Sequence, residues 1–287
     1  MKIVFMDAYT TNPGDLSWAP LAALGELRLY DRSPYEDSIR RIGDADAVFV
    51  NKHKITKEIL DLCPSVKFIG ESATGYNNID LAAAKEKKIA VANVPAYSTD
   101  AVAQHTFALI LEITNRVSDH KEAPLTVLAG KSLGIIGYGN IGKKVAEIAE
   151  AFGMSVNVYS RDKDSAVQSD FVTLHCPAAE NNMGFVNSEF IGKMKDGAVL
   201  INTARGVLLN ENDLAEALKS GKLSAAGLDV LKTEPPDGEN PLIGLPNCWI
   251  TPHIAWAPRD IRQRLISVCA ANLKSFIDGG VLNRVDL

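Results

Sequence analysis

The stretch that decides the fold is LGIIGYGNIG, Leu133–Gly142. A short apolar run meets three glycines spaced as G-x-G-x-x-G, and a helix-compatible segment, 143–152, follows them. Strand, tight turn and helix in this order are the context in which the pattern predicts dinucleotide binding. We expect Gly137 to permit the turn, Gly139 to let the backbone approach a pyrophosphate, and Gly142 to let helix and strand pack closely. The helix N-terminus at Asn140 and Ile141 then offers unpaired N–H groups to the phosphates.

The bulk composition limits the class of protein. With 287 residues, 46% apolar and 23% charged, the chain suits two ordinary globular domains. Its net charge of -5 argues against nucleic acid as a partner. No apolar run approaches a membrane span and the N-terminus does not resemble a signal peptide, so we expect a cytoplasmic protein. The four cysteines show no C-x-x-C pairing and the five histidines no cluster, which predicts reduced thiols and no metal site.

Short apolar runs alternate with helix-compatible stretches along the whole chain, which predicts an α/β fold with parallel sheets covered by helices on both faces. The expected strands are 3–6, 27–30, 47–50, 66–70, 89–94, 133–136, 155–159, 171–175, 199–202, 226–229 and 249–251. The last helix, 257–277, has no strand left to pair with in the second α/β unit, so we expect it to return to the first. The predicted domains are therefore 1–99 with 257–287, and a dinucleotide-binding domain at 100–256.

One connection is shorter than this pattern requires. Residues 161–169 must carry the crossover between two parallel strands, which usually takes about a dozen residues or more. Either this crossover is an abbreviated extended loop, or the chain lacks residues there. The segment 118–129 is similarly abrupt, and the sequence leaves both interpretations open.

Five further stretches accompany the glycine motif. They are SATGYNNID at Ser72–Asp80, NVPAYSTD at Asn93–Asp100, LINTARG at Leu200–Gly206, GLDVLKTEPP at Gly227–Pro236 and TPHIAW at Thr251–Trp256. Together they resemble the D-2-hydroxyacid dehydrogenase family over nearly the whole chain, and most of all its glycerate dehydrogenase or hydroxypyruvate/glyoxylate reductase branch. A departure is Gln104, where an acid is common before His105. The resemblance implies two doubly wound parallel-sheet domains, a Rossmann-type cofactor domain inserted in a flavodoxin-like substrate domain.

The resemblance also implies a catalytic set of Arg205, Glu234 and His253, and the residue types suit the chemistry. Histidine is the natural proton donor near neutral pH, and a neighbouring carboxylate favours its imidazolium form and fixes the ring. Arginine offers a planar fork to a carboxylate. Each residue alone could be an ordinary loop residue. All three follow successive strand-like runs, however, and ligands collect at the carboxyl ends of strands in such folds.

The resemblance implies further binding residues. Those expected to line the cofactor site are Thr99, His175, Cys176, Pro177, Thr203, Ala204 and Asp229. Backbone N–H groups of Ala73, Thr74 and Gly75 are expected to bind the substrate carboxylate. Asn51 and Trp256 are weaker candidates for the substrate site, with a solvated loop and a core tryptophan as the alternatives. We assign His53, His105 and His120 no catalytic role.

The residues after the second strand of the dinucleotide unit bear on the choice of cofactor. Enzymes that use NAD place an acid there to hold the ribose 2′-hydroxyl. Here Ser160 and Arg161 follow the strand directly, and a hydroxyl with a guanidinium suits a 2′-phosphate. Asp162 lies close enough to serve as the acid instead. The pattern favours NADP(H) over NAD(H).

These features predict an oxidoreductase that reduces a small 2-keto acid, glyoxylate or hydroxypyruvate, to its D-2-hydroxy acid in a cleft between the domains. One alternative is a dehydrogenase of another acid, such as phosphoglycerate or a bulkier keto acid. Another is a non-catalytic, nucleotide-sensing protein of the corepressor kind. A homodimer is expected from the resemblance and from the apolar face of the helix predicted at 100–117, although that face could simply be core.

Overall fold

The chain forms two compact units in the computed structural model, which describes residues 1–118, 125–236 and 238–287. Unit 1 comprises Met1–Tyr97 and Ala257–Leu287, and unit 2 comprises Ser98–Trp256. The sequence placed the first boundary two residues later, after residue 99, and the second at the same position. None of the helices in the described ranges is both long enough and apolar enough to cross a membrane.

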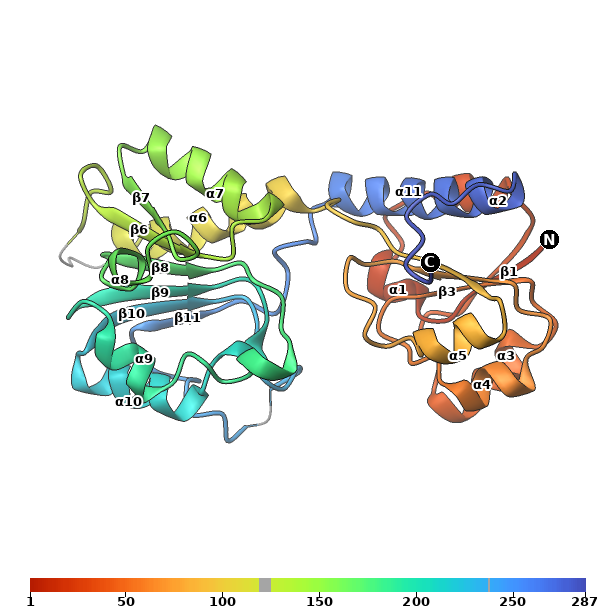
Figure 1. Cartoon of the computed structure of the whole chain (residues 1–287), viewed down its shortest axis with the longest axis horizontal. Coiled ribbons are helices and arrows are strands. Elements are labelled where there is room, and N and C mark those ends of the chain that lie inside the picture. The colour runs from red at the N-terminus through yellow and green to blue at the C-terminus, as the bar shows by residue number, and fades with distance from the viewer. Residues whose placement is uncertain (119–124, 237) are drawn as a thin grey trace. The chain divides into compact units, whose positions relative to one another are not determined.

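Unit 1 is built on a five-stranded parallel sheet in the order β2-β1-β3-β4-β5 (Figure 1). Its strands are β1 (Lys2–Phe5), β2 (Glu26–Leu29), β3 (Ala47–Val50), β4 (Phe68–Glu71) and β5 (Ala90–Ala92). The three central strands read as near-continuous apolar runs because both of their faces are covered. This order is the flavodoxin-like one, which confirms the predicted fold of the unit.

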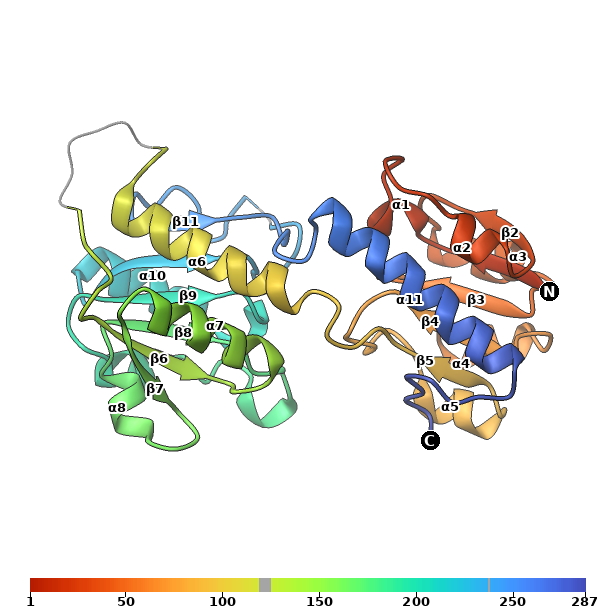
Figure 2. The ribbon, with the colours of Figure 1, turned by 90° about the horizontal axis from the view of Figure 1, so that it is seen from above.

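Helices cover both faces of the unit 1 sheet (Figure 1). On one face lie α3 (Ser38–Ile42), preceded by a 3-10 turn at Tyr35–Asp37, α4 (Lys57–Leu62) and α5 (Leu81–Glu86), whose apolar side chains join one core cluster. On the other lie α2 (Ala19–Ala22) and α11 (Arg259–Ile277). The last helix, α11, packs against β4 and α2 and lies across the unit 1 sheet (Figure 2). Phe276 of α11 and Phe68 of β4 have ring centroids 5.3 Å apart.

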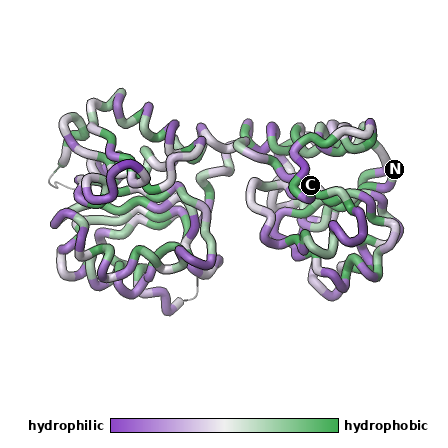
Figure 3. The backbone as a smooth tube through the Cα atoms, viewed as in Figure 1, coloured by the Kyte–Doolittle hydropathy of each residue, from purple (hydrophilic) through white to green (hydrophobic). Residues whose placement is uncertain are grey.

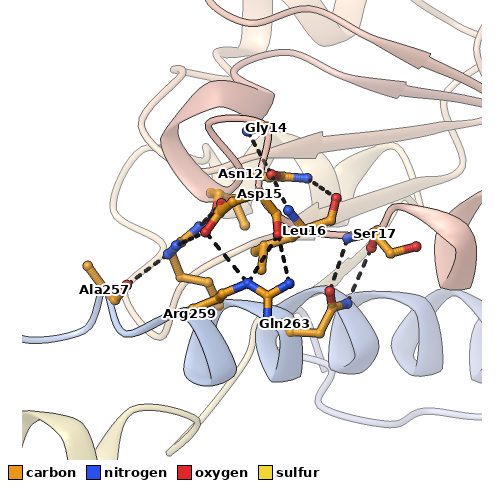
Figure 4. A network of polar contacts seen from close by, with 10 residues as sticks. Asn12, Gly14, Asp15, Leu16, Ser17, Ala257, Arg259 and Gln263 are labelled. Carbon is orange, nitrogen blue, oxygen red and sulfur yellow. Dashed lines mark hydrogen bonds and ion pairs between the residues drawn. The ribbon is translucent and has the colours of Figure 1, made fainter.

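The N-terminal end of α11 is tied to the loop that follows α1 (Ala8–Thr11), as Figure 4 shows. The Arg262 guanidinium makes a bidentate pair with the Asp15 carboxylate, at 2.8 and 2.7 Å, and lowers the pKa of that carboxyl through this bond. The Arg262 Nε atom also donates to the carbonyl oxygen of Ala257 at 2.8 Å. Gln263 and Ser17 exchange two hydrogen bonds. The start of the second segment of unit 1 is therefore fixed to its first segment.

Unit 2 is built on a six-stranded parallel sheet in the order β11-β10-β9-β8-β6-β7. Its strands are β6 (Ser132–Ile136), β7 (Ser155–Val158), β8 (Phe171–Leu174), β9 (Ala198–Asn202), β10 (Leu223–Leu228) and β11 (Cys248–Ile250). Along the tube these strands are mostly hydrophobic (Figure 3), as expected of a sheet covered on both faces. The strand order reverses at β6, because β7 lies on one side of it and β8 on the other. Ligands of open α/β sheets bind at such a switch point, beyond the carboxyl ends of the strands.

Two helix layers cover the unit 2 sheet (Figures 1 and 2). On one face, α6 (Thr99–Asn115) packs against α7 (Asn140–Ala151), and on the other α10 (Glu211–Ser220) packs against α9 (Ser188–Lys193). Phe107 and Ile110 of α6 belong to the core cluster that α6 shares with α7 and the sheet. The apolar face of this helix is thus core, the alternative that the sequence left open, and it gives no support to a dimer.

The short connection at 161–169 is a helical crossover and not the abbreviated extended loop that was one of the two interpretations. It contains α8 (Lys163–Val167), capped by the Asp162 side chain. Five residues suffice because α8 packs directly on β6 at Gly134, where an added Cβ would lie 1.9 Å from the carbonyl oxygen of Ala166. The other abrupt segment is 118–129. Its residues 119–124, which include His120, lie outside the described residues.

Candidate active site

The three glycines between β6 and α7 occupy three different environments. Gly137 has a φ of +100°, and an added Cβ would lie 2.4 Å from the backbone nitrogen of Cys176. At Gly142 an added Cβ would lie 2.1 Å from the carbonyl oxygen of Gly137, so this glycine brings α7 close to the turn. Gly139 has an ordinary φ of -80°, and an added Cβ there would meet none of the described atoms within 4 Å. The protein's own packing requires the first and third glycines, whereas the second borders open space at a helix N-terminus.

The residues after β8 close the other side of this turn. His175 donates its backbone N–H to the carbonyl oxygen of Ile136 at 2.7 Å, and its ring Nε2 lies 3.0 Å from the Thr173 hydroxyl. Burial lowers the pKa of His175 to about 3, so the ring is neutral at physiological pH. A neutral ring cannot act as a proton donor of the imidazolium type. Cys176 and Pro177 follow His175 in the chain, next to the glycine turn.

The turn that carries Arg205 is shaped by Asn202, a fully buried residue at the end of β9. The Asn202 side chain donates to the carbonyl oxygen of Arg205 and accepts the backbone N–H of Ala204, both at 2.9 Å. Gly206 follows, and a Cβ there would lie 2.0 Å from the carbonyl carbon of Leu231. The glycine therefore lets the turn touch the backbone of the loop that leads to Glu234. The Arg205 side chain itself is exposed and donates to the carbonyl oxygen of Ala204 at 2.7 Å.

The structure brings Glu234 and His253 together. The His253 Nδ1 atom lies 2.6 Å from the Glu234 Oε2 atom, and the side chains are 31% and 28% exposed. The second carboxylate oxygen of Glu234 accepts the backbone N–H of Leu231 at 3.1 Å, which holds the carboxylate in place. With Nδ1–H donated to a carboxylate, the Nε2 atom of the half-buried ring is the one left to exchange a proton. This is the geometry of an oriented general acid–base histidine.

Asp229 clamps the loop on which His253 lies. Its carboxylate, 1% exposed as a residue, accepts the Thr251 hydroxyl at 2.6 Å and the backbone N–H groups of Ile254 and Ala255 at 2.9 Å each. Burial acts to raise the pKa of Asp229, but these bonds, with one from His105, outweigh it and keep the pKa below its usual value. The sequence predicted Asp229 as a cofactor residue. Nothing in the local sequence indicates that its carboxylate anchors this loop.

The same clamp holds an unusual backbone conformation. His253 has a φ of +55°, in the left-handed region that few residues other than glycine adopt. Its N–H donates to the carbonyl oxygens of Asp229 and Thr251, and the Trp256 indole donates to the His253 carbonyl at 2.9 Å. His105, predicted to have no catalytic role, lies with Nε2 2.9 Å from the Thr251 hydroxyl and thereby supports the loop.

The residues after β7 lie beside the glycine turn. The Arg161 guanidinium is stacked over the ring of Tyr138, 5.1 Å from its centroid, and Tyr138 stands between the first two glycines. Both oxygens of Asp162 are engaged at the start of α8, one by the Ser165 hydroxyl at 2.6 Å and the other by the Ser165 N–H at 3.1 Å. These bonds, the one from the hydroxyl first, lower the pKa of Asp162. Its carboxylate is thus used as a helix cap, while Ser160 and Arg161 are exposed.

In unit 1, Ala73, Thr74 and Gly75 form a loop directly after β4. Their three backbone N–H groups donate to no atom of the described residues. The loop is held instead by its carbonyl groups and by the Thr74 hydroxyl, which donates to the carbonyl oxygen of Val94 at 2.9 Å. Adjacent free N–H groups of this kind can receive an anion.

Two other predicted positions in unit 1 support the loops around this one. The Asn51 side chain donates to the carbonyl oxygen of Ser72 at 2.8 Å, so its amide is used to hold the 73–75 loop. His53 is buried, with Nε2 2.8 Å from the Ser38 hydroxyl. This contact joins the loop after β3 to the start of α3.

Comparison with known proteins agrees with this geometry. Residues 90–255 match the family model of the D-isomer specific 2-hydroxyacid dehydrogenase, NAD binding domain. A hydroxypyruvate reductase of Blautia hydrogenotrophica is 46% identical over 321 aligned positions, covering 100% of each chain. Since this chain has 287 residues, that relative contains stretches without a counterpart here. A glycerate dehydrogenase of Methylorubrum extorquens is 34% identical, covering 88% of each chain. The solved structure of an acyclic imino acid reductase (Bsp5) in complex with NADPH and D-Arg superposes with a TM-score of 0.87, at 29% identity over 99% of this chain and 100% of that one.

The glycine turn at a sheet switch point and the carboxylate–histidine pair beyond later strands are the features of a nicotinamide-dependent oxidoreductase. With the matches above, the chain belongs to the D-isomer specific 2-hydroxyacid dehydrogenase family. The family resemblance inferred from the motifs is confirmed, as are the fold and the class of enzyme.

Proposed function

We propose that this enzyme reduces hydroxypyruvate or glyoxylate to the D-2-hydroxy acid, with NADPH as the preferred hydride donor. The observation that carries the proposal is the His253–Glu234 pair, 2.6 Å apart on a clamped loop of the cofactor-binding unit. The hydroxypyruvate reductase and glycerate dehydrogenase names of two relatives point to the same small keto acid. Of the alternatives drawn from the sequence, neither the corepressor-like protein nor the bulkier substrate is favoured by these matches.

The chain's own residues can perform the steps that the protein must supply. The residues that would hold the cofactor are the turn at Gly137–Gly142 and the segments after β7, β8 and β9, and the nicotinamide supplies the hydride when bound. His253 gives a proton from Nε2 to the carbonyl oxygen as it becomes an alkoxide, and Glu234 stabilises the imidazolium before that transfer. Arg205 binds the keto-acid oxygens through its planar fork. The free N–H groups of the 73–75 loop receive the carboxylate.

A substrate panel followed by NADPH absorbance tests the proposal. Hydroxypyruvate and glyoxylate should exceed phosphorylated hydroxypyruvate and aromatic keto acids by at least about tenfold in kcat/KM, because each misfitting group costs at least about 1.4 kcal/mol of transition-state binding. A preference for the phosphorylated substrate would favour the phosphoglycerate alternative. No oxidation of NADPH or NADH with any keto acid would favour the nucleotide-sensing alternative.

The cofactor preference rests on Arg161. Its guanidinium lies over Tyr138 beside the glycine turn, and the adjacent acid, Asp162, is used to cap α8. We expect Arg161→Ala to raise the KM for NADPH by about tenfold or more and to leave the KM for NADH within about twofold, since a charge-assisted bond to the 2′-phosphate is worth about 1.5–3 kcal/mol.

The matched control is Lys163→Ala, a nearby cation whose Nζ atom lies over the Tyr159 ring, 5.7 Å from its centroid. It should change neither KM by more than about twofold. If the wild type uses NADH as well as NADPH, and Arg161→Ala changes neither, the NADPH proposal is wrong.

We also propose a homodimer, on the family resemblance alone. The apolar face of α6 no longer supports it, because that face packs inside unit 2. Light scattering on the purified chain measures the mass directly.

A further inference from the structure

Glu71 is a carboxyl group that the reaction described above does not use. It is the last residue of β4, directly before Ser72 and the 73–75 loop, and it is 0% exposed. Its Oε2 atom accepts a hydrogen bond from the Asn78 side chain at 2.8 Å, whereas its Oε1 atom has no partner among the described residues. Burying a carboxyl with half of its hydrogen-bonding capacity unused is costly, so its presence here calls for a physical explanation.

Asn78 connects Glu71 to the end of the neighbouring strand. Its amide nitrogen also lies 3.0 Å from the carbonyl oxygen of His53 and 3.4 Å from that of Asn51. Asn51 in turn donates its side-chain N–H to the carbonyl oxygen of Ser72 at 2.8 Å. Glu71, Asn78, Asn51 and Ser72 thus form a closed circuit of contacts around the base of the 73–75 loop. This circuit adds to the bonds that join Ala73 and Thr74 to Val94, and losing one of its members would loosen the base of the loop.

The surroundings of Glu71 keep it neutral. Burial raises its pKa to about 9, the bond from Asn78 opposes this, and the charge of Asp7 at the end of β1 adds to it. Asp7 is itself held by the backbone N–H groups of Asn51, Lys52 and His53. The other titratable group that interacts with Glu71 is the buried thiol of Cys269 on α11, whose pKa is also raised by burial. Near pH 7 the group beneath the loop is therefore a carboxylic acid without charge.

We infer that Glu71 is a positioning residue of the substrate site, which holds the 73–75 loop through Asn78 and Asn51 in the conformation that receives the substrate carboxylate. The inference rests on the proposed function, where the loop is assigned to that carboxylate. The positioning role also explains why Glu71 is neutral, because a negative charge beneath the loop would repel an anionic keto acid. Glu71 acts through the loop and touches no reacting atom.

Two substitutions in the full chain separate the effect of the hydrogen bond to Asn78 from the effect of the charge on Glu71. Glu71→Gln keeps the acceptor for Asn78 and cannot ionise, so at pH 7 its KM for the keto acid should stay within about twofold of the wild type. Glu71→Leu keeps the volume but loses the bond, and its KM for the keto acid should rise about tenfold while kcat and the KM for NADPH change by less than about threefold. Asn78→Ala breaks the same bond from the other side and should show the same split, should Glu71→Leu fail to fold.

The pH dependence of the KM for the keto acid shows whether Glu71 positions the loop or only stabilises the fold. As the pH passes through about 9, where Glu71 ionises, the wild-type KM for the keto acid should rise more steeply than that of Glu71→Gln. Glu58→Gln, an exposed carboxylate in the first turn of α4, is the matched control and should follow the wild type.

Hydrogen exchange of the Ser72 and Val94 amides, which donate to the carbonyl oxygens of Val50 and Ala73 at the base of the loop, gives a readout in the free protein that needs no turnover. Exchange should be faster in Glu71→Leu and Asn78→Ala than in the wild type and Glu71→Gln. If the wild type reduces keto acids but these variants change neither the KM nor the exchange, the inference is wrong and the proposed function stands. If the wild type reduces no keto acid, the proposed function fails, and unchanged exchange would overturn the positioning role separately.

Discussion

His253→Asn should lower kcat for keto-acid reduction by about 10²–10⁴-fold and leave the Kd for NADPH within about twofold. The loss follows from the removal of the one proton donor that Glu234 orients, at 2.6 Å. Asparagine is the better substitution than alanine because residue 253 has a φ of +55°, a conformation that asparagine tolerates more readily than most residues. The loop clamped by Asp229 should therefore keep its shape. Single-turnover reduction and fluorescence titration of the cofactor measure the two quantities.

The matched control is His105→Gln, on the same clamp. His105 bonds to the Thr251 hydroxyl and is placed to support the loop, so its loss should lower the melting temperature by a few degrees and kcat by no more than about tenfold. Turnover near the wild-type level in His253→Asn would remove His253 from the proton transfer. An equal loss of kcat in both variants would show that loop order, and not proton donation, limits the rate.

The parts of the site that the sequence predicted lie at strand ends. Arg205, Glu234 and His253 are separated along the chain, yet each follows a strand of one parallel sheet, and the carboxyl ends of parallel strands meet at one edge. The same topology explains why the glycine turn and His175 are neighbours, since β6 and β8 pair directly. The family resemblance named these residues, and the geometry of parallel sheets explains why they lie at one edge.

The parts that the sequence missed depend on long-range contacts or on very short elements. His105 and Thr251 are 146 positions apart, and the sequence around neither residue predicts the hydrogen bond between them. The helix α8 has five residues, too few to show helical periodicity, and it fits because Gly134 leaves room for it. Glu71 lies one residue beyond the predicted strand at 66–70, and an acid at a strand end is ordinarily exposed. Its burial is set by contacts from Asn78 and α11 that only the fold creates.

The three glycines of the opening motif were predicted to serve different purposes, and substitution can separate them. Gly137→Ala should destabilise unit 2 by about 3 kcal/mol or more, because the φ of +100° is strained for any residue with a Cβ, and that Cβ would lie 2.4 Å from a backbone nitrogen that cannot yield. The melting temperature should fall by roughly 6–12 °C for a domain of this size. Thermal unfolding followed by circular dichroism measures the shift.

Gly139→Ala is the matched variant, one residue beyond Tyr138 in the same turn. Its φ of -80° suits alanine, and the added Cβ meets none of the described atoms within 4 Å, so the melting temperature should change by no more than about 2 °C. The affinity for NADPH should nevertheless fall by about tenfold or more, because the new methyl group would occupy the space through which the backbone approaches the pyrophosphate. Normal binding of NADPH by Gly139→Ala would show that this open space is not the pyrophosphate site. A glycine that the folded protein does not need, next to two that it does, is best explained by a ligand that comes close to the backbone at that point.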